Sequence, residues 1–198
     1  MYKIISPSSE PSIIGVNNGV YQVELIDKKS FINKEEKQYF ENFFNGKFIS
    51  FIFDNFQNIN LTKITELKYF PLKKAKETDF VRFSPNEMGL NFIVSQKVID
   101  IFKQFTISDY IKIPSKIDGF NTNYYTIGFP IITDNFINFS KSKFYHLINK
   151  TEFNNLSHEE YKKISGALVK TLSIELTDNN FKSDIINLQG QGVFFQIL

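Results

Sequence analysis

The sequence predicts an α+β fold: a mostly antiparallel sheet with about three helices packed on it, in a single compact domain of residues 1–198. Short segments in which apolar and polar residues alternate are numerous, as in half-buried strands. Helical periodicity is confined to three segments. The two kinds of segment do not alternate regularly along the chain, which favours α+β over a βαβ architecture.

Phenylalanine dominates the apolar composition. Hydrophobic residues make up 42% of the 198-residue chain, and 23 residues are phenylalanine. A chain of this length suits one domain with a sizeable core. Because each buried ring removes a large apolar area from water, we expect a core rich in phenylalanine.

The charge pattern argues against a nucleic-acid partner. The chain has 23 basic and 21 acidic residues, and Arg82 is its one arginine. Nucleic-acid recognition favours arginine, whose guanidinium group binds phosphates and base edges through two parallel hydrogen bonds. The densest basic run, Pro71–Lys76, is short, and we expect it to be a solvated loop.

Several other classes are excluded by what the sequence lacks. Cysteine is absent, so no disulfide, thiol nucleophile or thiolate metal site can form. The apolar runs are too short to cross a membrane. Residues 1–16 lack the basic start and long apolar stretch of a signal peptide. We therefore expect a soluble, cytoplasmic protein with no membrane partner.

The N-terminal half contains one predicted helix among extended segments. The helix begins after a capping residue, Asn33, carries acidic residues in its first turn and ends at Gly46. Its apolar face is formed by Tyr39, Phe40, Phe43 and Phe44. Strands are expected near residues 20–25, 47–56, 66–72 and 79–84.

The segment Gly89–Pro114 predicts a helix followed by a strand. Ser95 is the expected N-cap. The apolar face of the helix is expected to comprise Val94, Val98, Ile101, Phe102 and Phe105. A strand follows near residues 109–114, then a turn at Asp118, then a strand over residues 124–133 with Pro130 at an edge or bulge.

The C-terminal part predicts one more helix and two strand segments. Ser157 and Glu160 have the spacing of a capping box at the start of a helix. Strands are expected over residues 169–176 and 184–198. The run Gly190–Gly192 lies within the second segment, and we expect a tight turn there, because a phosphate-binding glycine loop would be followed by a helix.

The sequence contains no recognisable catalytic or metal-ligating pattern. His146 and His158 lie apart, without the spacing of a metal site. His158 is expected as an exposed residue at a helix start, His146 as a structural or surface residue, and Asp134 as a turn residue. We predict no catalytic residue, no metal and no cofactor. The enzymatic alternative is a small hydrolase that uses His146 and Asp134.

A pattern in Asn91–Phe144 extends this interpretation. A Val-Ser-x-Lys unit opens the helix, a strand then ends near a proline, and an aromatic strand leads to an aspartate and, shortly after, a serine. The positions concerned are Val94, Ser95, Lys97, Ile101, Phe102, Tyr110, Ile113, Tyr125, Ile132, Asp134 and Ser140. The pattern resembles the Imm11-type (DUF1629) and Imm43-type immunity proteins of bacterial polymorphic toxin systems, from which the run Gly128–Pro130 departs.

The resemblance implies a protein that binds a cognate toxin, the C-terminal domain of a secreted antibacterial effector, and occludes its active site. The helix after Ser95 would then be scaffold. From loop position alone, we expect the partner-binding loops to be Pro71–Thr78, Phe120–Tyr124 and Asn149–Asn155. The alternative from another class is a carbohydrate- or peptide-binding module, in which exposed aromatic rings line one groove.

Overall fold

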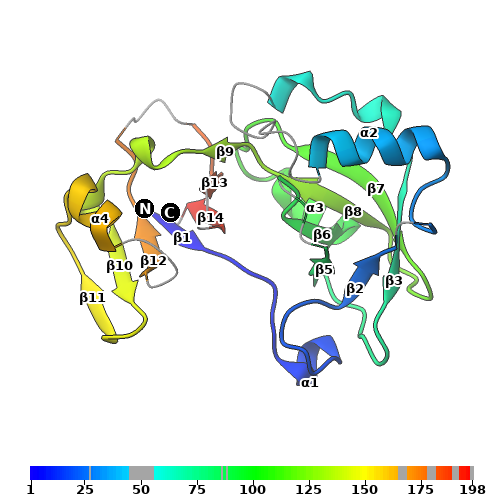
Figure 1. Ribbon diagram of the computed structural model, residues 1–198, viewed down its shortest axis with the longest axis horizontal. Coiled ribbons are helices and arrows are strands. Elements are labelled where there is room, and N and C mark those ends of the chain that lie inside the picture. Colours follow the sequence, from blue (N-terminus) through cyan, green and yellow to red (C-terminus); the bar gives the residue numbers. More distant parts are fainter. Residues whose placement is uncertain are drawn as a thin grey trace. The chain divides into compact units, whose positions relative to one another are not determined.

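The computed structural model of the protein describes residues 1–26, 28–44, 56–85, 87, 89–164, 169–177, 182–188 and 192–196 (Figure 1). These residues form four α-helices and two seven-stranded sheets with mostly antiparallel pairs. The predicted α+β class is therefore confirmed. The strands make two sheets where one was expected, and the contacts divide the chain into two compact units. Unit 1 comprises residues 1–6, 106–108 and 131–198, and unit 2 comprises residues 7–105 and 109–130.

The sheet of unit 2 contains antiparallel pairs and two parallel pairs, β3·β7 and β2·β5. In spatial order its strands are β4 (Phe80–Val81), β6 (Phe92–Ser95), β8 (Tyr124–Gly128), β7 (Ile111–Ile117), β3 (Leu67–Pro71), β2 (Val23–Leu25) and β5 (Phe83–Ser84). All of them except β6 lie in or overlap segments that the sequence predicts as strands. β6 precedes a helix without alternation, because both of its faces are buried.

The two edge strands of this sheet belong to one short run of chain, so the sheet closes on itself. Arg82 alone separates β4, which pairs with β6, from β5, which pairs with β2. The Arg82 carbonyl accepts hydrogen bonds from the N–H groups of Gln22 (3.0 Å) and Val23 (3.4 Å). The resulting barrel-like sheet pairs backbone groups that an open edge would leave unsatisfied.

A chain of three buried hydroxyl groups links strands β3, β8 and β7. Tyr69 Oη lies 2.9 Å from Thr126 Oγ1, which lies 2.8 Å from Ser115 Oγ. Ser115 Oγ donates to the Ile113 carbonyl at 3.0 Å, so every bond is satisfied if Thr126 donates to Ser115 and Tyr69 donates to Thr126. Burial raises the pKa of Tyr69, which keeps this hydroxyl protonated.

Unit 2 carries α1 (Pro11–Ile14), α2 (Lys34–Phe44) and α3 (Gln96–Phe102). α2 begins as predicted, because the Asn33 side chain accepts a hydrogen bond from the Glu36 N–H at 2.8 Å. α1 is not predicted from the sequence; it is a single turn that begins at a proline and ends at Gly15 in the left-handed conformation (φ 82°). The predicted C-cap Gly46 and the strand expected over residues 47–56, apart from Phe56, lie outside the described residues.

The buried face of α3 differs from the predicted one. Ser95 caps the helix, as expected, but the buried residues are Val98, Ile99 and Phe102. Ile101 is 43% exposed, which corrects the prediction that it faces the core. The helix ends at Phe102, so Phe105 lies beyond it and is 40% exposed. Because α3 has only two turns, fewer of its residues contact the sheet than the spacing of apolar residues in the sequence indicates.

The sheet of unit 1 is antiparallel except for the pair β13·β9. In spatial order its strands are β11 (Thr151–Phe153), β10 (Lys143–His146), β12 (Val169–Ile174), β1 (Tyr2–Ile4), β14 (Gly192–Gln196), β13 (Ile185–Leu188) and β9 (Ile131–Ile132). Pro130 lies between β8 and β9, at the boundary between the two units. Within the described residues, no helix has the length and apolarity needed to cross a bilayer.

Helix α4 (His158–Ile164) begins with the predicted capping box. The Ser157 N–H donates to the Glu160 carboxylate at 2.8 Å, and the Glu160 N–H donates to Ser157 Oγ at 3.2 Å. The helix packs Tyr161 into the core of unit 1. The expected phenylalanine-rich interior is also confirmed. Among the described residues, the buried phenylalanines are Phe40, Phe44, Phe56, Phe83, Phe92, Phe102, Phe129, Phe139, Phe144 and Phe194.

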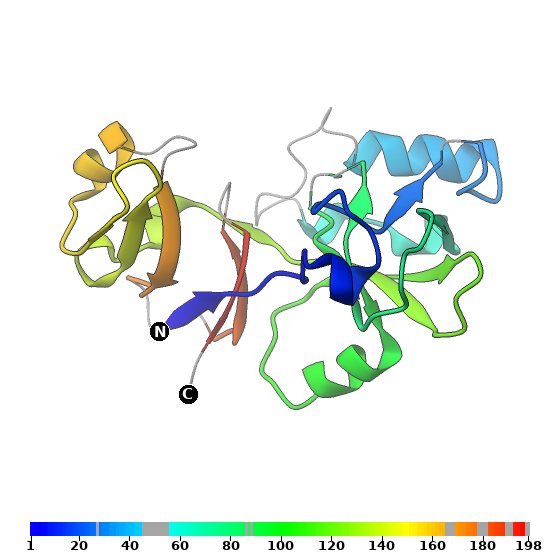
Figure 2. The ribbon, with the colours of Figure 1, turned by 90° about the horizontal axis from the view of Figure 1, so that it is seen from below.

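The N-terminal strand β1 is an interior strand of the sheet of unit 1, although all the other strands of this sheet come from residues 131–196. It pairs with β12 on one side and with β14 on the other (Figure 2). Tyr2 is 6% exposed and packs in the core, and its hydroxyl donates to the Ser183 carbonyl at 2.6 Å. The adjacent residue Lys3 points to the opposite face of the sheet and is exposed.

Substitution of Tyr2 should therefore destabilise unit 1. We expect Tyr2→Phe to lower the free energy of unfolding by about 1 kcal/mol through loss of one hydrogen bond. Tyr2→Ala should lower it by about 3–5 kcal/mol through loss of a buried ring. Urea unfolding of each variant would test this, with Lys3→Ala as the control, for which we expect a change within about 0.5 kcal/mol. Equal effects of Tyr2→Ala and Lys3→Ala would contradict the central position of β1.

Candidate functional site

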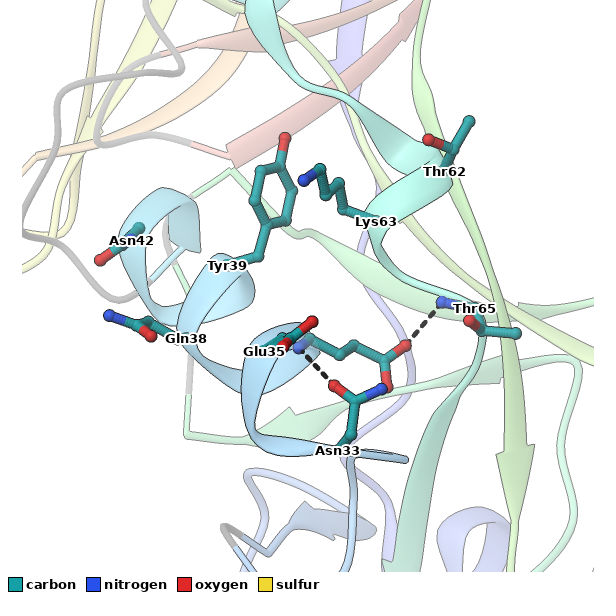
Figure 3. A pocket seen from close by; sticks show the side chains of 9 residues that line it. Asn33, Glu35, Gln38, Tyr39, Asn42, Thr62, Lys63 and Thr65 are labelled. Atoms are coloured by element: carbon teal, nitrogen blue, oxygen red, sulfur yellow. Dashed lines mark hydrogen bonds between the residues drawn. The ribbon is translucent and has the colours of Figure 1, made fainter.

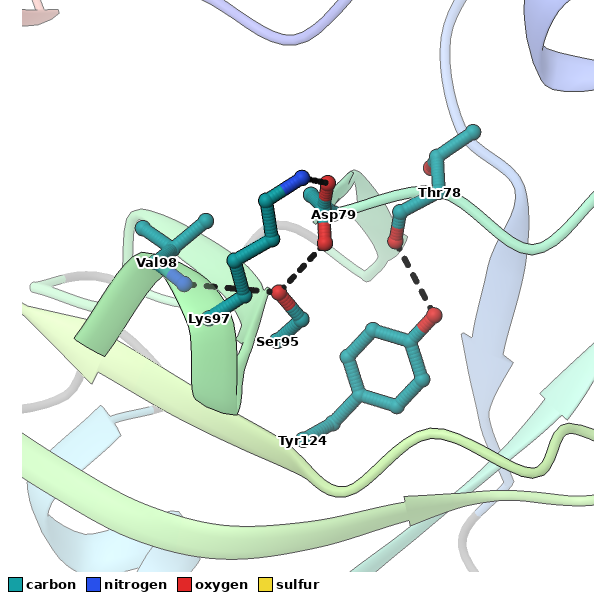
Figure 4. A network of polar contacts seen from close by, with 6 residues as sticks. All are labelled: Thr78, Asp79, Ser95, Lys97, Val98 and Tyr124. Atoms are coloured by element: carbon teal, nitrogen blue, oxygen red, sulfur yellow. Dashed lines mark hydrogen bonds and ion pairs between the residues drawn. The ribbon is translucent and has the colours of Figure 1, made fainter. Parts of the chain in front are cut away.

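Two of the three expected partner-binding loops are joined in unit 2. The Glu77 carboxylate accepts hydrogen bonds from the backbone N–H groups of Thr122 (2.8 Å) and Asn121 (3.4 Å). Tyr124 Oη donates to the Thr78 carbonyl at 2.9 Å (Figure 4). These bonds connect the segment Pro71–Asp79 to the turn between β7 and β8, residues 118–123. We call the two segments together the joined loops.

Helix α1 supports the first of these segments from its other side. The Lys76 N–H donates to the Ile14 carbonyl at 2.9 Å, and Lys76 Nζ donates to the Ser12 carbonyl at 2.9 Å. Gly15 lies so close to the segment that a Cβ atom there would be 2.0 Å from the Lys74 carbonyl oxygen. Only glycine permits this approach together with a φ of 82°. The basic run is thus held in place by backbone contacts.

Gln22 anchors the same segment from the interior. Its side chain is 1% exposed, and its Nε2 atom donates to the Lys76 carbonyl (3.0 Å) and to Thr78 Oγ1 (3.2 Å). Thr78 Oγ1 in turn donates to the Phe80 carbonyl at 2.8 Å. The Oε1 atom of Gln22 has no hydrogen-bond partner among the described residues. Two donors on one buried amide therefore hold the end of the segment where it enters β4.

A polar cluster at the start of α3 completes the support (Figure 4). Ser95 Oγ donates to Asp79 Oδ1 at 2.6 Å and accepts the Val98 N–H at 3.4 Å. Lys97 Nζ lies 3.2 Å from Asp79 Oδ2. The Ser95 N–H also donates to the Asp79 carbonyl at 3.0 Å. Asp79, the last residue of the loop segment, is thus joined to the N-terminus of α3 through both its backbone and its side chain.

The electrostatics of the joined loops keep both carboxylates ionised. The hydrogen bond from Ser95 and the nearby Lys97 lower the pKa of Asp79. Hydrogen bonds from the Thr122 side chain and backbone lower the pKa of Glu77. Burial, together with the charge of Glu77, raises the pKa of Tyr124 to about 12. Tyr124 therefore remains a hydrogen-bond donor at neutral pH.

The outer surface of the joined loops presents exposed charges. Lys73 and Lys74 are exposed, and within the described residues neither ammonium group has a hydrogen bond or ion pair. This agrees with the predicted solvated basic run. The surface that reaches solvent is basic at its tip, whereas the carboxylates of Glu77 and Asp79 are occupied by the contacts that hold the loop.

The third expected loop, Asn149–Asn155, belongs to the β10–β11 hairpin of unit 1. His146 Nδ1 accepts the Asn149 N–H at 3.1 Å, which fixes the turn. Leu147 and Ile148, at the turn, are 48% and 65% exposed. The loop expected from the sequence begins just after these two residues, so it omits the most exposed apolar pair in the hairpin. The signal was present as two adjacent aliphatic residues before Asn149.

The histidines and Asp134 do not form the pair that the hydrolase alternative requires. Asp134, in a 3-10 turn (Asp134–Phe136), lies with its Oδ2 atom 2.9 Å from His158 Nε2. His158 is half-buried and stacks on Phe139 with ring centroids 4.8 Å apart, which corrects the expectation of an exposed residue. No hydrogen bond joins Asp134 to His146, which instead binds Asn149. The described residues contain no cluster of three or more His, Asp or Glu side chains suited to a metal ion.

The residues that carry the family resemblance have mainly structural contacts. Val94, Phe102, Ile113 and Ile132 are buried. Tyr125 Oη donates to the Gln96 side chain at 2.8 Å, and Tyr110 packs on Phe129 with centroids 5.6 Å apart. Ile101 and Ser140 are exposed. Two of the polar members, Ser95 and Lys97, bind Asp79, whereas Asp134 binds His158. Asp79 was not singled out from the sequence, and no local spacing could have indicated it.

Comparisons with protein-family models, with curated proteins and with solved structures found no match. The functional interpretation therefore depends on the residues and geometry described above.

Removal of the Ser95 hydroxyl should destabilise unit 2. Ser95→Ala removes a helix cap and a hydrogen bond to Asp79, so we expect a loss of about 1–2 kcal/mol in the free energy of unfolding. Lys97→Ala is the control, because the ion pair is largely exposed and contributes less than about 1 kcal/mol. Thermal unfolding of the two variants would distinguish them. If Lys97→Ala lowered the free energy of unfolding as much as Ser95→Ala, the result would contradict the larger contribution assigned to the Ser95 hydroxyl.

The joined loops should loosen in acid. Both carboxylates have pKa values lowered by folding, so their contribution is present above the unfolded values of about 4 and is lost as pH falls through the folded values. We expect hydrogen exchange of the Thr122 and Val98 amides to accelerate, beyond the intrinsic dependence, as the pH falls below the unfolded values of about 4. Glu77→Gln should remove the response at Thr122 and retain it at Val98. An unchanged Thr122 response in that variant would contradict the role of Glu77.

Proposed function

We propose that this protein is an immunity protein that binds and neutralises the toxin domain of a cognate secreted antibacterial effector. It acts in the cytoplasm, and it works by occluding the toxin's active site, with no chemistry of its own. The proposal begins from the resemblance of Asn91–Phe144 to the Imm11-type and Imm43-type immunity proteins. It needs support from the geometry, because the resemblance consists of apolar and capping residues.

One observation carries the proposal. Two polar residues of the resembling segment, Ser95 and Lys97, bind Asp79 and so hold an exposed loop in position. Glu77 and Tyr124 add further bonds to the same loop. Groups that serve catalysis would instead converge on a space that a substrate can occupy. Here the polar groups instead bind a surface loop and hold it in position, which supports recognition of a partner.

The physical properties of the joined loops suit a protein partner. A loop that is ordered before binding loses less conformational entropy when the complex forms. The exposed ammonium groups of Lys73 and Lys74 would steer an acidic surface toward this site and set the rate of association. We therefore propose that the joined loops form part of the interface and that the facing toxin surface is acidic there. The joined loops support this function more than the hydrolase alternative, whose two residues bind different partners.

The test of the function is expression of the toxin domain encoded beside this protein in a sensitive bacterium, with and without this chain. We expect growth to stop with the toxin domain alone and to recover when both are present. A stable complex of the two purified chains should accompany recovery. Toxicity that persists in the presence of this protein, with no complex, would refute the immunity function.

The interface is tested separately by charge reversal. We expect Lys73→Glu/Lys74→Glu to slow association with the toxin domain about tenfold with little change in stability, because both side chains are exposed and unpaired. The matched control is Lys28→Glu/Lys34→Glu, which has the same change in net charge at other exposed sites of unit 2. Association rates by surface plasmon resonance would compare them. Equal rates for the two variants would remove the joined loops from the interface.

A further inference from the structure

A polar cleft of about 540 Å³ lies in unit 2 between helix α2 and residues 62–65, away from the joined loops (Figure 3). One wall is a single face of α2, and the other is the short 3-10 helix η2 (Leu61–Lys63) with Thr65. The volume falls within the range of small-molecule sites, roughly 300–1,000 Å³. A single partner side chain would leave most of this space empty.

Two hydrogen bonds tie the walls together, so the cleft exists before any ligand binds. Glu36 is 4% exposed, and its carboxylate accepts N–H groups from Ile32, in the preceding loop, and from Thr65, on the other wall. Tyr39 Oη accepts the Asn60 N–H at 2.7 Å. Asn33 and Glu36 have the spacing of a capping box, so the sequence indicates that the Glu36 side chain binds backbone N–H groups at the start of α2. These contacts fix the width of the cleft at two points.

The lining of the cleft also carries polar side chains that have no partner among the described residues. Glu35, Gln38 and Asn42 lie at positions i, i+3 and i+7 of α2, so they share one helical face. Lys63 stands on the opposite wall (Figure 3). Among the described residues, none of these four side chains has a hydrogen bond or an ion pair. The cleft therefore offers unused donors and acceptors on both sides.

The charges in the cleft select the class of ligand. The lining contains two carboxylates and one ammonium group. The Glu36 carboxylate is buried and accepts two N–H groups of the protein. The exposed charges that a ligand would meet are those of one acidic residue, Glu35, and one basic residue, Lys63. A strongly anionic ligand would be attracted by Lys63 and repelled by Glu35, and a strongly cationic ligand would be attracted by Glu35 and repelled by Lys63. The two amides of Gln38 and Asn42 each donate and accept, as do hydroxyl groups. The face of Tyr39 supplies an apolar patch beside them.

We propose that this cleft binds an uncharged polyhydroxylated molecule, the size of one or two sugar rings. Ring hydroxyls bind the amides of Gln38 and Asn42 and the charged groups of Glu35 and Lys63, and the C–H face of the ring packs on Tyr39. The site is separate from the joined loops, so it does not depend on the proposed immunity function. It gives the chain a second binding activity, for a neutral saccharide.

The test is a titration of the isotope-labelled full chain with neutral saccharides: glucose, galactose, N-acetylglucosamine, maltose and cellobiose. We expect at least one to shift the amide signals of residues 33–42 and 60–65 with a Kd on the order of 1 mM. Gln38→Ala and Asn42→Ala should each weaken that binding about three- to tenfold, as expected for loss of one hydrogen bond. Both positions are exposed on a helix that alanine favours, so the fold should be retained.

The controls separate this proposal from weak general binding. Glu41→Gln, on the same helix but outside the cleft, should leave the Kd unchanged. Glucose 6-phosphate and glucosamine serve as anionic and cationic probes, and both should bind more weakly than glucose. The proposal fails if none of the neutral saccharides shifts these signals at a concentration of about 50 mM, which is far above the expected Kd. It also fails if Gln38→Ala and Asn42→Ala have no effect, or if a charged probe binds more tightly than every neutral one.

Discussion

The double pairing of residues Phe80–Ser84 is the constraint on which the rest of unit 2 depends. This run of chain pairs with β6 through β4 and with β2 through β5, and the Arg82 carbonyl receives two N–H groups at the crossing point. The register of β4 on β6, which pairs Phe80 with Val94, places Asp79, the residue before this run, beside Ser95 at the end of β6. The loop before it and the helix after Ser95 are thereby held to the same point. Loss of the pairing would release both.

The supporting contacts of the joined loops gain their strength from burial and from backbone donors. Gln22 is almost fully buried, and its amide binds two groups of the loop. Glu77 uses backbone N–H groups of the neighbouring turn, which have few other partners in a turn. The ion pair of Lys97 with Asp79 is exposed and adds little by comparison. A surface fixed in this way keeps its shape while leaving its lysines free to meet a partner.

Unit 2 thus presents two surfaces with different chemistry. The joined loops display unpaired cationic groups and a backbone fixed by internal contacts, which favours an extended acidic partner surface. The cleft beside α2 is concave, exposes one carboxylate and one ammonium group, and is lined by two amides that have no hydrogen bond among the described residues, which favours a small uncharged ligand. The two surfaces use different residues, so the two proposed binding activities can be tested independently by substitution.

The sequence alone determined the elements whose causes are local. The caps at Asn33, Ser95 and Ser157 are confirmed, because a cap depends on a side chain and an N–H group three residues away. The strands of unit 2 were found largely from alternation, and the phenylalanine-rich core from composition. The single-turn helix α1 and the exposure of Ile101 were missed, because a short helix has too few residues for its periodicity to define a face.

Tertiary structure decided the pairings between distant residues. Tyr2 joins an interior strand with residues beyond 169, Asp134 meets His158 in place of His146, and Asp79 meets Ser95. It also divided the strands between two sheets and joined two of the three expected loops while leaving the third in unit 1. No local spacing encodes these contacts, because each depends on which apolar faces pack together and on where the closed sheet brings its ends.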